Sequence, residues 1–141
     1  MKAITRSILA LGLLVGLSYV GTAADTKKDI DSTPQGKVYR ASQKAIQEGN
    51  YEAYTKCMTS EAVKEIEKQT KEMGKTPKDG MEMMKMMAPT DIKFTDLKVD
   101  GKKATLMATG KMDKETMKGS IDLAEENGQW KVGKQSWSNS K

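Results

Sequence analysis

The sequence contains no histidine among its 141 residues. This absence excludes Ser-His-Asp and Cys-His catalytic groups and every metal site built on histidine ligands. It also removes the side chain that titrates near neutral pH without a shifted pKa. Catalysis would need an Asp, Glu, Lys or Tyr with a shifted pKa, so a protein that is not an enzyme is the leading expectation.

Cysteine is almost as scarce, because Cys57 is the only one. An internal disulfide is therefore excluded, and a small buried apolar role is expected for Cys57. An intermolecular disulfide or a reactive thiol stays open as an alternative. No cysteine lies near Ala24, which excludes a bacterial lipid anchor at the cleavage site expected there.

The sequence also lacks a long apolar run. The longest, from Ile8 to Val20, covers 13 residues, whereas a membrane-spanning helix needs about 20. Two positive residues precede this run, and the small residues of segment 22–24 follow it. This order is typical of a secretory signal peptide. We expect residues 1–24 to be removed near Ala24, no stable membrane insertion, and a periplasmic or secreted location.

Arginine is rare and positive charge is not concentrated. The chain has 24 Lys and Arg residues against 19 Asp and Glu residues, and a net charge of +5. Without Lys2 and Arg6 of the leader the counts are 22 against 19, and Arg40 is then the only arginine. Nucleic-acid-binding proteins usually carry a basic stripe with arginines or interleaved aromatic residues. No nucleic-acid partner is therefore expected.

The first half of the mature chain has helical patterns. Residues 25–32 are polar without periodicity, which predicts a flexible leader. Helices are then expected from Thr33-Pro34 to Gly49, over 51–57, and from Thr59 or Ser60 to Gly74, because capping residues, proline and glycine mark these boundaries. A fourth helix should begin at Thr76-Pro77 and reach about residue 88, with its regular part starting only after the awkward Asp79-Gly80 pair.

From Thr90 onward apolar residues alternate with polar ones, which indicates strands. We expect strands over 92–99, 104–109, 119–123 and 130–137, and a polar connection over 111–116. The first is either one strand with a bulge near Thr95-Asp96 or two short strands. Asp100-Gly101 and Asn127-Gly128 are typical hairpin turns. The prediction is one α+β domain over residues 33–141, with N-terminal helices packed on the apolar face of a curved antiparallel sheet of about four strands.

Several of these segments resemble a known family. They are the Thr33-Pro34 start, the Gly49-Asn50-Tyr51 break, the strand KKATLMATG over 102–110 and the hairpin ENGQWKV over 126–132. Together they resemble small secreted members of the nuclear-transport-factor-2-like superfamily, which are often described as cystatin-like. The resemblance implies a cone with a pocket at its open end. Some relatives are isomerases or dehydratases and many have no assigned activity, but no catalytic residue and no cofactor carries over to this chain.

The segment from Met81 to Met87 holds five methionines. On a helix they spread over an arc about twice the ~100° that a surface helix needs to face a core. One interpretation is a wide core-facing helix. A second is a lid or patch for an apolar ligand or partner, because methionine adapts to many shapes. A third is a Cu(I) site, because thioether ligands select Cu(I).

The leading hypothesis is an exported, non-enzymatic domain. It would bind an apolar or amphipathic small molecule, or a protein segment, in a cone-mouth pocket beside the methionine helix. A homodimer is possible, and the aromatic candidates are also expected in the core. The candidate ligand-binding residues are Tyr39, Tyr54, Met81, Met84, Met87, Phe94 and Trp130.

Two alternatives remain open. The first is a periplasmic Cu(I)-binding protein. The second is an enzyme of the isomerase or dehydratase type, which only the family resemblance suggests. The copper ligands of the first alternative would be Met81, Met83, Met84, Met86 and Met87.

Overall fold

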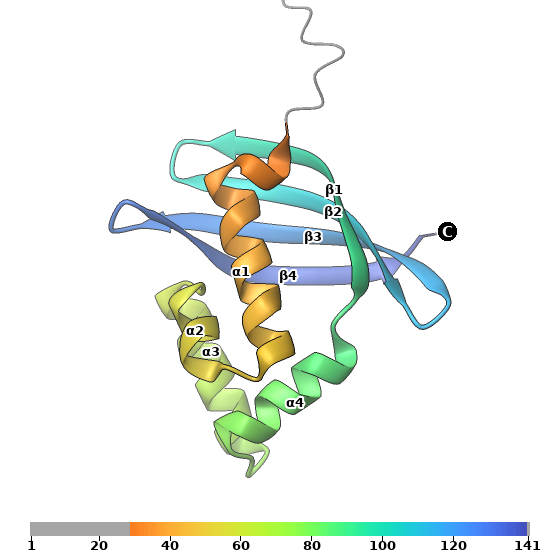
Figure 1. The fold of residues 1–141 in the computed structure, drawn as a ribbon. Coiled ribbons are helices and arrows are strands. Elements are labelled where there is room, and N and C mark those ends of the chain that lie inside the picture. The colour runs from red at the N-terminus through yellow and green to blue at the C-terminus, as the bar shows by residue number, and fades with distance from the viewer. Residues whose placement is uncertain (1–28, 141) are drawn as a thin grey trace, which may run out of the picture.

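The computed structural model describes residues 29–140. The expected signal peptide and residues 25–28 lie outside this range. The described chain is a short 3-10 helix and four α-helices, followed by four strands (Figure 1). Their bounds are η1 Ile30–Ser32, α1 Pro34–Glu48, α2 Tyr51–Lys56, α3 Ser60–Glu72, α4 Pro77–Met87, β1 Thr90–Asp100, β2 Lys103–Met112, β3 Glu115–Glu126 and β4 Gln129–Asn139.

Side-chain caps set the starts of the first three α-helices, close to the boundaries predicted from sequence. The side chain of Thr33 accepts from the Gly36 amide, that of Asn50 from the Ala53 amide, and that of Thr59 from the Ala62 amide. Each bond satisfies one amide that has no partner within its helix. α1 ends at Gly49, whose φ of 66° is the left-handed conformation that glycine adopts without a steric penalty.

α4 corrects one expectation. The helix is regular from Pro77 onward and does not wait until after Asp79-Gly80. Asp79 is the third residue of a capping box: its carboxylate accepts from the Thr76 amide, and the Thr76 hydroxyl oxygen accepts from the Asp79 amide. Gly80 packs against Thr70 of α3, and a Cβ built on it would lie 3.5 Å from the Thr70 hydroxyl, an ordinary contact distance.

The strands form one antiparallel sheet in the order β1-β2-β3-β4. Register shifts interrupt the β1–β2 pairing between Phe94 and Asp96, as the sequence predicted, and the β3–β4 pairing between Ile121 and Leu123. The polar connection expected over 111–116 is wrong, because Met112 pairs with Glu115 across a two-residue turn. The two register shifts are β-bulges, which bend their strands and increase the twist of the sheet.

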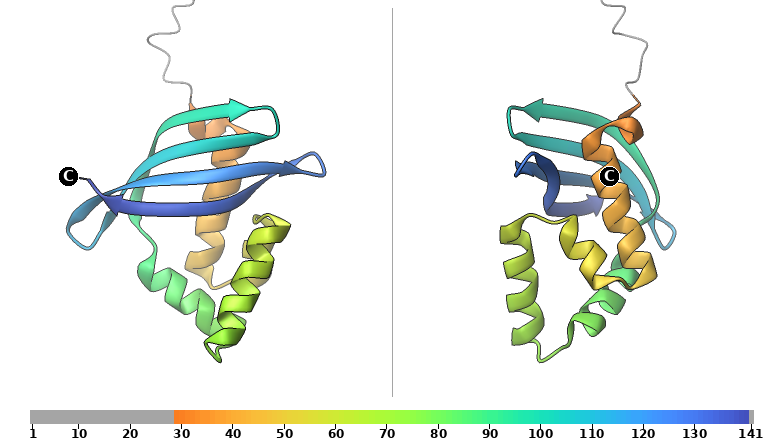
Figure 2. Two further views of the ribbon diagram at one scale, coloured as in Figure 1. Left: turned by 180° about the vertical axis from the view of Figure 1, so that it is seen from behind. Right: turned by 60° about the vertical axis from the view of Figure 1, so that its left-hand side comes forward.

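The sheet is curved, and α1 crosses its concave face and extends beyond the β4 edge (Figure 1). Helices α2, α3 and α4 gather beyond that edge (Figure 2). The core lies between α1 and the sheet, and its fully buried side chains include Tyr39, Met81, Leu106, Ile121 and Val132. The predicted α+β class, with helices on one face of a four-stranded sheet, is confirmed.

The flexible leader predicted over 25–32 is wrong for its described part. Residues 30–32 form η1, and Ile30 packs against the core. The guanidinium of Arg40 fixes this turn, because its Nε donates to Asp31 Oδ1 at 2.7 Å and its Nη2 donates to the Ile92 carbonyl at 2.9 Å. These contacts join η1 to α1 and β1, and a sequence pattern shows no such long-range partner. Within residues 29–140, no helix is both long and apolar enough to cross a bilayer.

Candidate functional site

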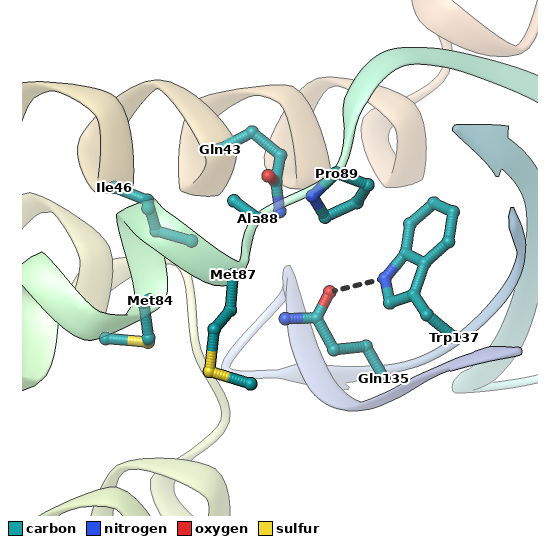
Figure 3. A pocket seen from close by; sticks show the side chains of 8 residues that line it. All are labelled: Gln43, Ile46, Met84, Met87, Ala88, Pro89, Gln135 and Trp137. Atoms are coloured by element: carbon teal, nitrogen blue, oxygen red, sulfur yellow. Dashed lines mark hydrogen bonds between the residues drawn. The ribbon is translucent and has the colours of Figure 1, made fainter. Parts of the chain in front are cut away.

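A pocket of about 180 Å³ opens between the C-terminal end of α4, the middle of α1 and the concave side of β4 (Figure 3). It lies beside the methionine helix, where the sequence placed a pocket. None of its lining residues is ionisable. They are Gln43, Ile46, Met84, Met87, Ala88, Pro89, Gln135 and Trp137.

One wall of the pocket comes from α4 and the residues that follow it. Met84 is partly buried, whereas Met87 at the mouth is 66% exposed. Pro89 is buried directly after the helix. Because proline restricts the residue before it to extended backbone, α4 ends at Met87 and the chain turns toward β1. This turn leaves Met87 at the rim of the pocket.

The opposite wall is the indole of Trp137. A Cβ built on Gly119 would lie 2.8 Å from three atoms of this ring, and one built on Gly110 would lie 3.2 Å from it. Both glycines are on the buried face of the sheet. The ring therefore lies flush against bare backbone, and a glycine within a strand often marks such a close approach.

Gln135 supplies a polar group inside this apolar wall. Its Oε1 accepts from the Tyr39 hydroxyl at 3.2 Å and from the Trp137 Nε1 at 3.5 Å. Because an indole N–H can only donate, the amide oxygen must face it, and the amide nitrogen points the other way. Figure 3 shows that nitrogen turned toward Met87 and the pocket. Burial raises the pKa of Tyr39, so its hydroxyl keeps the proton that it donates.

The structure brings together two of the seven predicted ligand-binding residues, Met84 and Met87, which both line the pocket. Whether they bind a ligand stays a prediction. Tyr39, Tyr54 and Met81 do not line this pocket, because each is at most 2% exposed in the core, and their contact with a ligand stays a prediction. Tyr39 still donates a hydrogen bond to Gln135, which lines the pocket.

Phe94 and Trp130 also lie elsewhere. The Phe94 ring packs against Tyr39 at 5.9 Å between centroids and is covered by the Arg40 guanidinium at 4.3 Å. Trp130 is partly buried near the start of β4, opposite Glu125 of β3. The register shift in β4 separates Trp130 from the Gln135 end of the strand, so alternation counted from Trp130 could not locate the pocket.

Sequence reasoning missed six of the eight lining residues, which are Gln43, Ile46, Ala88, Pro89, Gln135 and Trp137. Only the two glycines under the indole carried a sequence signal, because Gly110 and Gly119 interrupt otherwise good strands. Pairing Trp137 opposite Gly119 requires the β3–β4 register, which the bulge alters.

The five methionines expected as Cu(I) ligands have different surroundings. Met81 is 1% exposed, whereas Met86 is 79% and Met87 66% exposed. The sulfur of Met83 also has a neighbour already, because the Lys75 ammonium lies 2.9 Å from it. A cation next to this sulfur opposes the binding of a second cation. A Cu(I) site in this segment stays a prediction, and the surroundings of Met81 and Met83 do not favour these two residues as its ligands.

Charged residues line two other hollows. One, of about 350 Å³, lies near the β4 bulge and includes Asp122, Glu126 and Lys134. The other, of about 260 Å³, lies between the end of α1 and the start of α4 and includes Glu48, Lys78 and Lys85. Among residues 29–140, no group of three or more Cys, Asp or Glu side chains is arranged to hold a metal ion.

No protein-family model and no curated protein sequence matches this chain. Several solved structures have a similar arrangement of elements. A SEC-C motif containing protein from Rhodopseudomonas palustris is 8% identical, with 70% of this chain and 74% of that chain covered, at a TM-score of 0.48. A nuclear-transport-factor-2-like protein of unknown function from Shewanella oneidensis is 13% identical, with 75% and 97% covered, at a TM-score of 0.48.

A third structure, provisionally described as a ketosteroid isomerase from Kribbella flavida, is 14% identical. It covers 79% of this chain and 82% of its own, at a TM-score of 0.44. Proteins of the superfamily that the sequence resembles are thus among the structures similar to this chain. The similarity concerns the fold and transfers no activity.

Proposed function

We propose that this α+β domain, with its nuclear-transport-factor-2-like arrangement of helices and sheet, is exported and binds a small amphipathic molecule between α4 and Trp137. The observation that supports the proposal most is the pocket itself. It is lined by two thioethers, an indole and aliphatic groups, with glutamine amides as its polar groups. Small-molecule sites are typically concave and apolar, with few polar groups that orient the ligand. The proposed export depends on the leader pattern of residues 1–24.

The volume sets the size of the ligand. A cavity of about 150 Å³ lined by apolar side chains can hold benzene, and this pocket measures about 180 Å³. It suits one or two fused rings, or the end of a longer chain whose remainder leaves past Met87. A protein segment could insert only one side chain at a time, so we favour the small molecule.

The amides set the polarity of the ligand. The Gln135 nitrogen faces the pocket, while its oxygen is occupied by Tyr39 and Trp137. An N–H donor in this position favours a ligand with a carbonyl or hydroxyl oxygen. No lining side chain is acidic or basic, so the pocket offers no general base for isomerase chemistry and no counter-ion for a charged ligand.

Saturation-transfer NMR on the mature chain tests the proposal with 2-naphthol, an aromatic hydroxyl compound of suitable size. Binding is expected with a Kd on the order of 1 mM, because a ligand of this size gains about 0.3–0.4 kcal/mol per heavy atom. Ala88→Trp should abolish the signal by filling the pocket. Met86→Gln is the matched control, because this exposed neighbour is not part of the lining and should leave the signal unchanged.

The polar group is tested with naphthalene, which lacks the hydroxyl. The wild-type chain should prefer 2-naphthol, and Gln135→Leu should reduce that preference by roughly fivefold, as expected for the loss of one hydrogen bond. Absence of 2-naphthol binding to the folded wild-type chain, or equal binding by Ala88→Trp, would contradict the proposed site.

A further inference from the structure

The methionine side chains of this protein differ widely in their access to solvent. Met86 is 79% exposed, Met87 66% and Met73 51%, whereas Met81 is 1% exposed and Met58 5%. Oxidation of a thioether requires an oxidant to reach a sulfur lone pair. A small soluble oxidant should therefore oxidise the three exposed methionines much faster than the two buried ones.

Met87 differs from the other exposed methionines in its position, because it also lines the pocket. It is at the mouth, across from Gln135 in Figure 3, and 66% of its side chain is exposed. Met86, its neighbour in the chain, is not among the lining residues. A chemical change at Met87 therefore alters the pocket, while the same change at Met86 does not.

We propose that Met87 is a reversible oxidation site through which hydroperoxides lower ligand binding in this pocket. The inference rests on the proposed function, and it assigns a form of regulation to the same site. In the reaction, a lone pair of the Met87 sulfur attacks one peroxide oxygen and the O–O bond breaks. The attacked oxygen stays on the sulfur and its proton passes to the leaving hydroxide, so the sulfur is oxidised by two electrons to a sulfoxide and hydrogen peroxide is reduced to water.

The product changes the polarity of the pocket mouth. A sulfoxide carries a strong dipole and an oxygen acceptor where the thioether had neither. An apolar ligand would have to desolvate this group without giving it a hydrogen bond, which opposes binding. The sulfoxide oxygen can also accept from the Gln135 amide that faces Met87, and would then compete for the donor offered to the ligand.

The fold should survive this oxidation. The Met81 side chain that holds α4 in the core is fully buried, whereas Met86 and Met87 are on the outside of the last helical turn. Met83 is partly protected as well, since the Lys75 ammonium donates to its sulfur. Loss of binding would thus occur in a folded protein, and a methionine sulfoxide reductase could restore the thioether.

The experiment treats the mature chain with hydrogen peroxide for increasing times and then removes the oxidant. Peptide mass spectrometry ranks the oxidised methionines, and saturation-transfer NMR measures 2-naphthol binding in the same samples. Met87 should oxidise with Met86, well before Met84 and Met81. Binding should fall roughly tenfold as Met87 sulfoxide accumulates, as expected for an apolar ligand placed against an unsatisfied polar group.

Two leucine variants isolate the site. Whatever affinity Met87→Leu has for 2-naphthol before treatment, that affinity should change less than about twofold after it, because leucine has no sulfur to oxidise, whereas Met86→Leu should lose binding like the wild-type chain. The inference is overturned if Met87 oxidises no faster than Met81, or if the Met87 sulfoxide form binds as well as the thioether form. Absence of binding in the untreated chain would instead overturn the proposed function, and the regulation with it.

Discussion

The indole of Trp137 lies directly on Gly119 of the neighbouring strand, at a distance that leaves no room for a Cβ. The two residues are paired across β3 and β4. Gly110 of β2 extends the same bare strip under the ring, which Pro89 borders from the side of α4. The position of the Trp137 ring in the pocket wall therefore requires glycine at both 110 and 119.

The first prediction concerns this contact. Gly119→Ala should place a methyl group 2.8 Å from three ring atoms, which forces the indole to move. We expect a loss of about 1–3 kcal/mol in the free energy of unfolding, typical of overpacking, and loss of 2-naphthol binding. Urea denaturation measures the first effect. In a Trp137→Leu background the same alanine should cost much less, and equal costs in both backgrounds would refute the contact.

The second prediction separates two methionines of α4 that the sequence treats alike. Met81→Ala should reduce the free energy of unfolding by about 2–5 kcal/mol, because it leaves a cavity in the core. Met86→Ala should change it by no more than about 0.5 kcal/mol, because this side chain is 79% exposed. Urea denaturation of both variants measures the difference. Similar values for the two would show that α4 packs with another face inward.

The third prediction concerns alkaline pH. Burial raises the pKa of Tyr54 to about 12 from an ordinary value of 10.0, so the unfolded chain loses this proton first. The contribution of the protonated Tyr54 to the free energy of unfolding is fully present below pH 10 and is lost as the pH rises toward 12. At pH 11, halfway through this range, Tyr54→Phe should remove about 1 kcal/mol of that loss. Urea denaturation at pH 8 and pH 11 gives the decrease in the free energy of unfolding for each protein. An equal decrease in the wild type and in Tyr54→Phe would contradict the raised pKa of Tyr54.

Much of the fold could be predicted from the sequence, because its boundaries depend on local chemistry. Thr33, Asn50 and Thr59 cap helices through amides three positions away, and Asn127-Gly128 closes its hairpin. The start of α4 at Thr76-Pro77 is confirmed. Only the later onset of its regular part was wrong, because the Asp79 carboxylate accepts from the Thr76 amide, an effect stronger than the low helix propensity of Asp-Gly. In each case the deciding contact spans one turn of chain.

The pocket was less predictable, because its walls come from segments that are distant in sequence. The apolar arc of α4 is wider than packing against the core requires, which indicated that some of its methionines would lie outside the core. Met84 and Met87 do line the pocket. Trp137 and Gln135 join them only after the bulge in β4 sets the register. Alternation counted without that bulge selects Trp130, which lies elsewhere on the strand.

The last prediction concerns η1, the turn that the sequence analysis treated as flexible. The Arg40 guanidinium stacks on Phe94 at 4.3 Å and pairs with Asp31 at 2.7 Å. Arg40→Met keeps the apolar stem and removes the charge, the ion pair and the bond to the Ile92 carbonyl. Since Arg40 is 40% exposed, the expected loss is only about 1 kcal/mol.

This loss should be local to η1. The Thr33 amide, which donates to the Ile30 carbonyl, should exchange its hydrogen roughly fivefold faster in Arg40→Met, as an opening free energy lower by about 1 kcal/mol requires. Lys44→Met is the matched control on the same helix, because its side chain is 77% exposed and its ion pair with Glu48 is 3.8 Å long. Equal exchange at Thr33 in both variants would mean that Ile30 packing alone holds η1, and that the Arg40 contacts contribute nothing to it.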